Sequence, residues 1–126
     1  MQQLTIKGRL PGLNEIIAMA KHGKGKYQPY QTAKKEITEM ILWECKAQMM
    51  MPCAIRSTVN VKMEWHCKNK RRDKDNVMVG QKFILDALQH AGIIRNDGWK
   101  EIGRIEHTFL IRPEEQIIIT MEEETL

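Results

Sequence analysis

Nine residues near the middle of the chain constrain its fold most, because they alternate strictly between apolar and polar side chains. In the segment 58–66, Val59, Val61, Met63 and Trp65 alternate with polar residues. Successive side chains of a strand point to opposite faces, so this pattern predicts a strand with one apolar face. Such a face has to be covered by a second layer of structure, which here is expected to be helical.

Two longer segments show helical spacing instead. Apolar residues recur at this spacing from Ile37 to Met49, which predicts a first long helix that begins with Thr32 as N-cap and stops at Pro52. A second helix is expected from Val77 to Ala91, where the following Gly92 suits a helix C-terminus.

Further strands are expected towards both ends of the chain. They are predicted at residues 2–10, 102–111 and 116–121. A short helix capped by Asn14 follows the first, and a Gly/Lys-rich basic loop fills 21–32. The last two strands are expected to form a closing hairpin. The expected fold is therefore α+β: one two-layer domain over residues 1–126, with a small mixed sheet packed against two main helices.

Composition excludes several classes of protein. No apolar run approaches the ~20 residues that span a bilayer, and the first ten residues do not form a signal peptide, so a cytoplasmic protein without a membrane partner is expected. Three cysteines without a Cys-x-x-Cys pair give no zinc-finger pattern. No phosphate-binding glycine motif is present, so no nucleotide cofactor is expected. The net charge of +4 suggests a polyanionic partner, although charge alone is weak support.

The chemistry is concentrated in the segment 68–97. Asp73 and Asp75 are two residues apart, so in an extended stretch their carboxylates point the same way. Mg²⁺ usually takes one or two carboxylates and keeps waters that phosphate oxygens can replace. A turn after the second helix can bring Asp97 near them as a third acid. On spacing alone, however, ordinary turn and N-cap chemistry is the favoured interpretation of these acids.

Five cations surround the two acids, at Lys68, Lys70, Arg71, Arg72 and Lys74. Carboxylates alone repel a phosphodiester, so a site that cuts one needs a metal to neutralise the acids and cations to hold the flanking phosphates. The segment supplies both kinds of group.

At this point the sequence resembles a known family. The motifs KRRDKDN and FILDALQHAGIIRND, together with GRLPGLNE near the start and NDGWKEI after the helix, are similar to the RusA family of Holliday junction resolvases. These are small endodeoxyribonucleases of DNA recombination and repair that are common in phages and prophages. The resemblance covers most of the chain and implies a RusA-like fold.

The resemblance also implies which residues act. Asp73, Asp75 and Asp97 match the family's three catalytic, metal-binding aspartates. The catalytic lysine corresponds to Lys82 when positions are counted back from Asp86, although four residues after Asp75 the chain has a valine. An exposed helical lysine paired with Asp86 is the alternative interpretation of Lys82.

By resemblance, the expected activity is Mg²⁺-dependent resolution of four-way DNA junctions by paired, symmetric nicks, with one or two Mg²⁺ ions per subunit. Two symmetric incisions call for a homodimer. The cations around the acids are expected to bind DNA phosphates, and Lys24 and Lys26 could form a second phosphate-contacting arm or an ordinary solvated loop. A nuclease for flaps or other branched DNA, and a DNA-binding module without catalysis, remain as alternatives.

Overall fold

Strand β2 (Ser57–Cys67), which carries the alternating pattern, lies inside a four-stranded sheet of order β1-β4-β2-β3. The computed structural model describes residues 1–26 and 28–125. Residue 27, in the predicted basic loop, and residue 126, the last of the predicted domain, lie outside the described residues. The other elements are β1 (Gln2–Lys7), α1 (Leu13–Lys21), α2 (Pro29–Ala47), α3 (Lys74–Met78), α4 (Gln81–His90), β3 (Ile102–Ile111) and β4 (Gln116–Thr125).

The sheet is mixed, as expected. β2 pairs in parallel with β3 and antiparallel with β4, and β4 pairs antiparallel with β1. The predicted closing hairpin is wrong, because β2 lies between the last two strands. The connection from β3 to β4 instead passes the end of β2, where the Arg112 amide donates a hydrogen bond of 2.9 Å to the Cys67 carbonyl.

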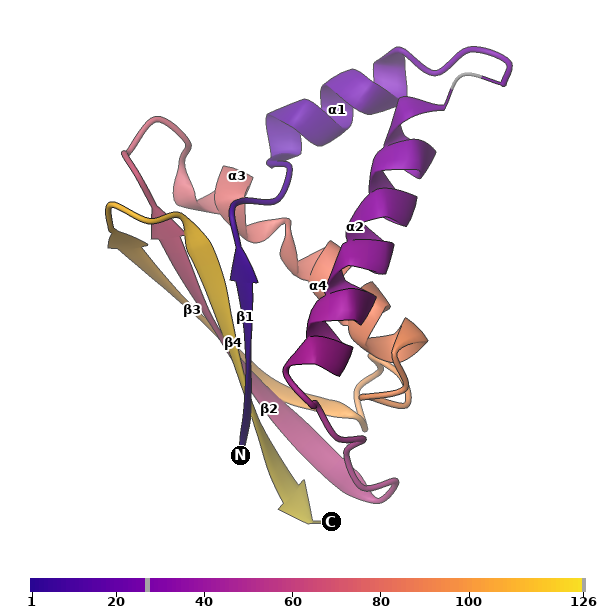
Figure 1. Cartoon of the computed structure of the whole chain (residues 1–126), viewed down its shortest axis with the longest axis vertical. Helices are drawn as coiled ribbons and strands as arrows, with labels where there is room; N and C mark the ends of the chain where they lie inside the picture. The colour runs from indigo at the N-terminus through magenta and orange to yellow at the C-terminus, as the bar shows by residue number, and fades with distance from the viewer. Residues whose placement is uncertain (27, 126) are drawn as a thin grey trace.

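The helices lie on one side of the sheet, and α2 and α4 supply buried residues that pack against it (Figure 1). The four apolar residues of β2 that alternate in the sequence are each at most 3% exposed. They share the core with Ile119 and Met121 of β4, with Ile41 and Cys45 of α2, and with five buried residues of α4. The fold is therefore a single small α+β domain in two layers, as the sequence predicts. None of the described helices is long and apolar enough to cross a membrane.

The first long helix is shifted from its predicted position. α2 begins at Pro29 rather than after Thr32, because proline is well suited to the first helical position, where its missing N–H has no partner to lose. The helix ends at Ala47, and Met49 beyond it has a φ of 55° and is 80% exposed. Its spacing predicted that Met49 continues the apolar stripe of the helix, and this prediction is wrong.

The predicted second helix is two helices. The helix is interrupted between α3 and α4, and Gly80 in this short connection lies against the ring of Trp65. A Cβ placed on Gly80 would come 3.0 Å from Trp65 Cη2 and 3.3 Å from Leu10 Cδ1. The turn between the two helices therefore packs closely against β2, a contact that no local periodicity reveals.

Candidate functional site

The two adjacent acids lie at the edge of the sheet where the parallel strands β2 and β3 end. Asp73 and Asp75 line a cavity of about 720 Å³ that we call the acid pocket. Sites beyond the carboxyl ends of parallel strands are common in sheets of this kind. The other residues that line the pocket are Cys67, Asn69, Lys70, Arg72, Lys74, Val77, Phe109, Leu110 and Ile111.

Asp73 occupies the N-cap position of α3, as the turn interpretation of the motif predicts. Its backbone is extended, with φ −66° and ψ 158°, and its carbonyl accepts a hydrogen bond of 3.1 Å from the Val77 amide. Its carboxylate makes no capping hydrogen bond among the described residues, however. Asp75 lies in the first turn of the same helix, and both acids are exposed. Asp73 can therefore stand at the N-cap position through its backbone while its carboxylate remains available to bind a metal ion.

Cations share the acid pocket with the acids. Lys70 and Lys74 are exposed, and Lys74 Nζ lies 5.7 Å from the centre of the Phe109 ring, so one wall is both cationic and aromatic. Lys68 and Arg71, two further predicted DNA-binding residues, line a neighbouring cavity of about 120 Å³.

Arg72 differs from these exposed cations because its side chain is held against the N-terminal segment. Its side chain is only 18% exposed. Arg72 Nη1 donates a hydrogen bond of 3.1 Å to the Leu10 carbonyl and lies 4.0 Å from Glu15 Oε1. The sequence grouped Arg72 with the phosphate-binding cations, whereas the structure ties it to the N-terminal segment.

The third acid and the lysine lie together but apart from the acid pocket. Lys82 Nζ is 3.1 Å from Asp86 Oδ1 and 3.8 Å from Asp97 Oδ2, and neither Lys82 nor Asp97 lines the acid pocket. The pKa of Lys82 is raised, chiefly by its hydrogen bond to Asp86 and also by the charge of Asp97. The ammonium therefore keeps its proton, which suits a role as a cation and not as a base.

A complete metal site is not assembled by the described part of the chain. Across residues 1–26 and 28–125, no three carboxylate, imidazole or thiol groups are placed to hold one ion. Asp73 and Asp75 nevertheless fit Mg²⁺ as a sparse set of oxygen ligands, since this ion keeps several waters and is often completed by substrate phosphates.

The predicted second DNA-contacting arm lies at a different place on the molecule. Lys24 and Lys26 are exposed in the connection between α1 and α2. This connection is at the far end of α1 from α3 (Figure 1). The two lysines therefore do not join the acid pocket.

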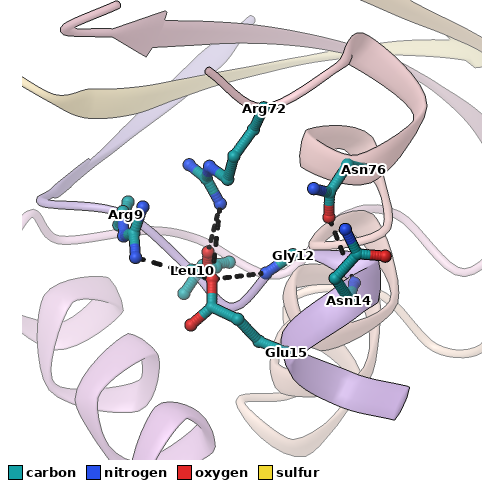
Figure 2. Close-up of polar contacts among 7 residues, drawn as sticks. All are labelled: Arg9, Leu10, Gly12, Asn14, Glu15, Arg72 and Asn76. Carbon is teal, nitrogen blue, oxygen red and sulfur yellow. Dashed lines mark hydrogen bonds and ion pairs between the residues drawn. The ribbon is translucent and has the colours of Figure 1, made fainter. Parts of the chain in front are cut away.

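Sequence reasoning missed a contact between the motifs GRLPGLNE and KRRDKDN, which are far apart in the chain. Figure 2 shows that residues on both sides of the acid pair contact the segment Arg9–Glu15, which we call the N-terminal latch. On one side Arg72 binds the Leu10 carbonyl. On the other side Asn76 Oδ1 accepts a hydrogen bond of 3.3 Å from the Asn14 amide. The signal that could have indicated it was the occurrence of GRLPGLNE alongside KRRDKDN, since no periodicity connects the two.

Asn76 acts as an N-cap for α1 although it belongs to α3. The N-cap position of α1 is Gly12, which has no side chain to accept the Asn14 amide at the second helical position. A Cβ on Gly12 would overlap Asn76 Oδ1, so the amide oxygen fills the space that a local capping side chain would need. Glu15 Oε1 accepts the Gly12 amide at 3.3 Å and lies 3.5 Å from Arg9 Nη2, which closes the latch.

In the comparisons with known proteins, no family model matches the chain and no curated protein matches it.

Proposed function

We propose that this protein is a Mg²⁺-dependent endonuclease that cuts branched DNA, with the four-way junction as its substrate. One observation carries the proposal: two exposed carboxylates and the cations Lys70 and Lys74 line one pocket beyond the ends of β2 and β3. A pocket for cutting a phosphodiester needs both kinds of group, because the acids alone would repel the phosphate. The resemblance of the surrounding motifs to the RusA family supports the choice of substrate.

In this proposal, the residues of the acid pocket divide the work. Asp73 and Asp75 supply oxygen ligands for Mg²⁺, which would activate the attacking water and offset charge on the scissile phosphate. Lys70 and Lys74 bind the flanking phosphates and fix the register of the DNA backbone. Phe109 gives the pocket an apolar wall beside Lys74, against which a sugar or base can pack.

Lys82 and Asp97 enter the proposal as a second group on α4 and the loop before β3. Lys82, whose Nζ lies 3.1 Å from Asp86 Oδ1 and 3.8 Å from Asp97 Oδ2, serves as a cation that stabilises developing negative charge or orients a phosphate. Asp97, 3.8 Å away, helps to keep it charged. Paired incision of a junction further requires two copies of the acid pocket, so we propose a homodimer.

The test is incubation of the purified protein with a synthetic four-way junction, a flap and a matched linear duplex, each with Mg²⁺ and with a chelator. Symmetric nicks in the junction alone, dependent on Mg²⁺, are expected. Cleavage of flaps as well would move the proposal to a general nuclease for branched DNA.

Replacing Asp75 tests the role of the acid pair directly. Asp75→Asn removes a charged ligand and should lower the cleavage rate by at least about 100-fold while junction binding, measured by gel shift, is kept or strengthened. Glu39→Gln, an exposed acid on α2, is the matched control and should cut like the unchanged protein. Equal cleavage by Asp75→Asn and the control would contradict the proposal.

A DNA-binding module without catalysis is the second candidate, favoured by one specific observation. Within residues 1–26 and 28–125 the third acid, Asp97, is engaged by Lys82 and lies outside the acid pocket lining. Junction binding without cutting under Mg²⁺ or Mn²⁺ would establish this candidate in place of the nuclease.

A further inference from the structure

The acid pair stands on a short segment that is tied down at both ends. Arg72 immediately precedes Asp73, and Asn76 immediately follows Asp75. Both flanking residues bind the N-terminal latch, which is about sixty residues away in the sequence: Arg72 through the Leu10 carbonyl and Asn76 through the Asn14 amide (Figure 2). Between these two ties, the acids themselves are exposed.

The support beneath the acids is otherwise slight. α3 has only five residues, and Val77 is its one buried side chain. A helix this short gains little from its own hydrogen bonds, because nucleation is costly and few bonds follow it. The position of the two carboxylates therefore depends on contacts made outside α3.

We propose that the N-terminal latch is a positioning element for the acid pair, and that Asn76 is its positioning residue. The proposal rests on the proposed function for its catalytic consequence, though its structural part does not depend on it. Asn76 links two short helices at once, since its side chain caps α1 while its backbone belongs to α3. Movement of the latch is then passed to the backbone that carries Asp75.

Gly12 makes the proposal testable without simply weakening the fold. In Gly12→Ser, the new Cβ overlaps Asn76 Oδ1 and lies 3.1 Å from the Asn76 carbonyl oxygen. It therefore displaces that side chain and presses on the backbone of α3, while the serine hydroxyl caps α1 locally. The contact between α1 and α3 is lost, but the cap on α1 is kept. Asn76→Ala loses both the contact and the cap.

A matched control removes a comparable contact elsewhere. The Gln48 side chain also joins an N-terminal element to a helix, since its Oε1 accepts the Thr5 amide at 2.8 Å and its Nε2 donates to the Thr5 carbonyl at 2.7 Å. Gln48→Ala therefore breaks side-chain bonds to the N-terminal backbone without touching the acid pocket.

Melting temperature separates capping from positioning. Gly12→Ser should melt close to the unchanged protein, because the local cap offsets the close approach to the Asn76 carbonyl, and Asn76→Ala should melt roughly 3–6 °C lower because α1 loses its cap. The double variant Gly12→Ser/Asn76→Ala should recover the melting temperature, since serine then caps α1 in the space that asparagine leaves.

The cleavage rate should depend on whether the contact between Asn76 and the Asn14 amide is present, and not on the melting temperature. At subsaturating Mg²⁺, all three variants should cut junctions roughly 10- to 100-fold more slowly, the cost of a misplaced reacting group, and the double variant should not be rescued. Raising Mg²⁺ should recover part of the rate, and metal-free junction binding should be unchanged. Normal cleavage by Gly12→Ser and by the double variant would reduce Asn76 to a helix cap and overturn the proposal.

Amide hydrogen exchange tests the structural part without any activity. The Val77 amide, which donates to the Asp73 carbonyl, reports whether the first turn of α3 holds its position. Its exchange should accelerate at least about tenfold in Gly12→Ser and Asn76→Ala, and stay unchanged in Gln48→Ala. If the unchanged protein cuts no branched DNA, the nuclease proposal fails. If exchange at Val77 is unaltered in Gly12→Ser and Asn76→Ala, the positioning role of the N-terminal latch is refuted.

Discussion

At the scale of single residues, Met49 holds a backbone conformation that favours glycine. With φ at 55°, it is the left-handed residue that ends α2, and the Met50 amide beyond it donates 2.9 Å to the Cys45 carbonyl. Its side chain is 80% exposed, so it contributes little packing to offset the strain. The sequence could not show this, because Met49 continues the apolar spacing of the helix.

Replacing Met49 should therefore stabilise the protein. Met49→Gly removes the clash of Cβ in the left-handed region and should raise the free energy of unfolding by about 1 kcal/mol. Urea denaturation measures it, with Met51→Gly, at a methionine that is 65% exposed, as a comparison in which no gain is expected. A loss of stability in Met49→Gly would show that its side chain packs in some way that its exposure hides.

His107 should make the stability of the protein depend on pH. Its Nδ1 accepts a hydrogen bond of 2.9 Å from Trp65 Nε1, so the ring proton is on Nε2, which donates to Gln81 Oε1 at 2.8 Å. Burial lowers the pKa of His107 below its ordinary value of 6.5. Protonation would also place a second donor opposite the Trp65 indole N–H.

Because the pKa of His107 is lowered in the folded protein, the protein should lose stability as the pH falls. The contribution of neutral His107 to stability is fully present above pH 6.5, and is lost as the pH falls from there towards the lower pKa of the folded state. Thermal melts between pH 7.5 and about pH 5 should show this loss. His107→Gln should flatten this dependence, whereas replacing the exposed His90 should not; parallel curves for all three proteins would count against the assignment.

At the scale of elements, the break between α3 and α4 illustrates what the sequence predicts and what it does not. Period-2 alternation located β2 within a residue at each end, because that pattern is local. The break was not predicted, and at it Gly80 lies against the ring of Trp65, a contact between residues that periodicity treats as unrelated. The order of the strands was likewise beyond prediction, since β3 and β4 are adjacent in the chain but separated by β2.

The candidate site divides in the same way. The pairing of Asp73 with Asp75 and their cationic surroundings could be predicted, since residues close in sequence stay close in space. Asp97 was grouped with them through the turn expected after the second helix, and Lys82 through the family resemblance. The structure places these two beside each other, and neither lines the acid pocket. The N-terminal latch was not predicted, because long-range contacts leave no local pattern.

Gly80 offers a direct test of the break. Gly80 has ordinary helical dihedrals, so alanine would normally be favoured there, but its Cβ would come 3.0–3.1 Å from the rigid Trp65 ring. Gly80→Ala should therefore lower the free energy of unfolding by about 1–3 kcal/mol. Gly98→Ala, whose Cβ meets nothing nearer than 3.6 Å, is the control and should be close to neutral in the same denaturation experiment.

At the scale of the whole molecule, the exposed cations near the end of β2 determine how the affinity of the proposed DNA binding should depend on salt concentration. Lys68, Lys70, Arg71 and Lys74 are exposed around the end of β2, whereas Arg72 is held by Leu10 and Glu15. A residue that contacts a phosphate releases counterions on binding, but a residue held within the protein does not.

Substituting these cations should thus have two different outcomes. Lys70→Ala and Lys74→Ala should each weaken junction binding and reduce the slope of log affinity against log salt by about 1. Arg72→Ala should change the slope little and instead lower the melting temperature. Fluorescence anisotropy over a salt series measures the slopes, and an Arg72→Ala slope reduced like the others would show that Arg72 contacts DNA phosphates despite its partners in the protein.

The strand order has a consequence for how the protein is made. β1 pairs with β4 alone among the described strands, so Leu4 finds its cross-strand neighbour, Ile119, only after more than a hundred further residues have been synthesised. On the ribosome, the first strand therefore emerges long before the strand that completes its backbone hydrogen bonds. Contacts this distant in sequence are slow to form. Until β4 has been synthesised, the nascent chain carries a strand whose apolar residues Leu4 and Ile6 lack their partners, a period when binding by a chaperone would protect it from aggregation.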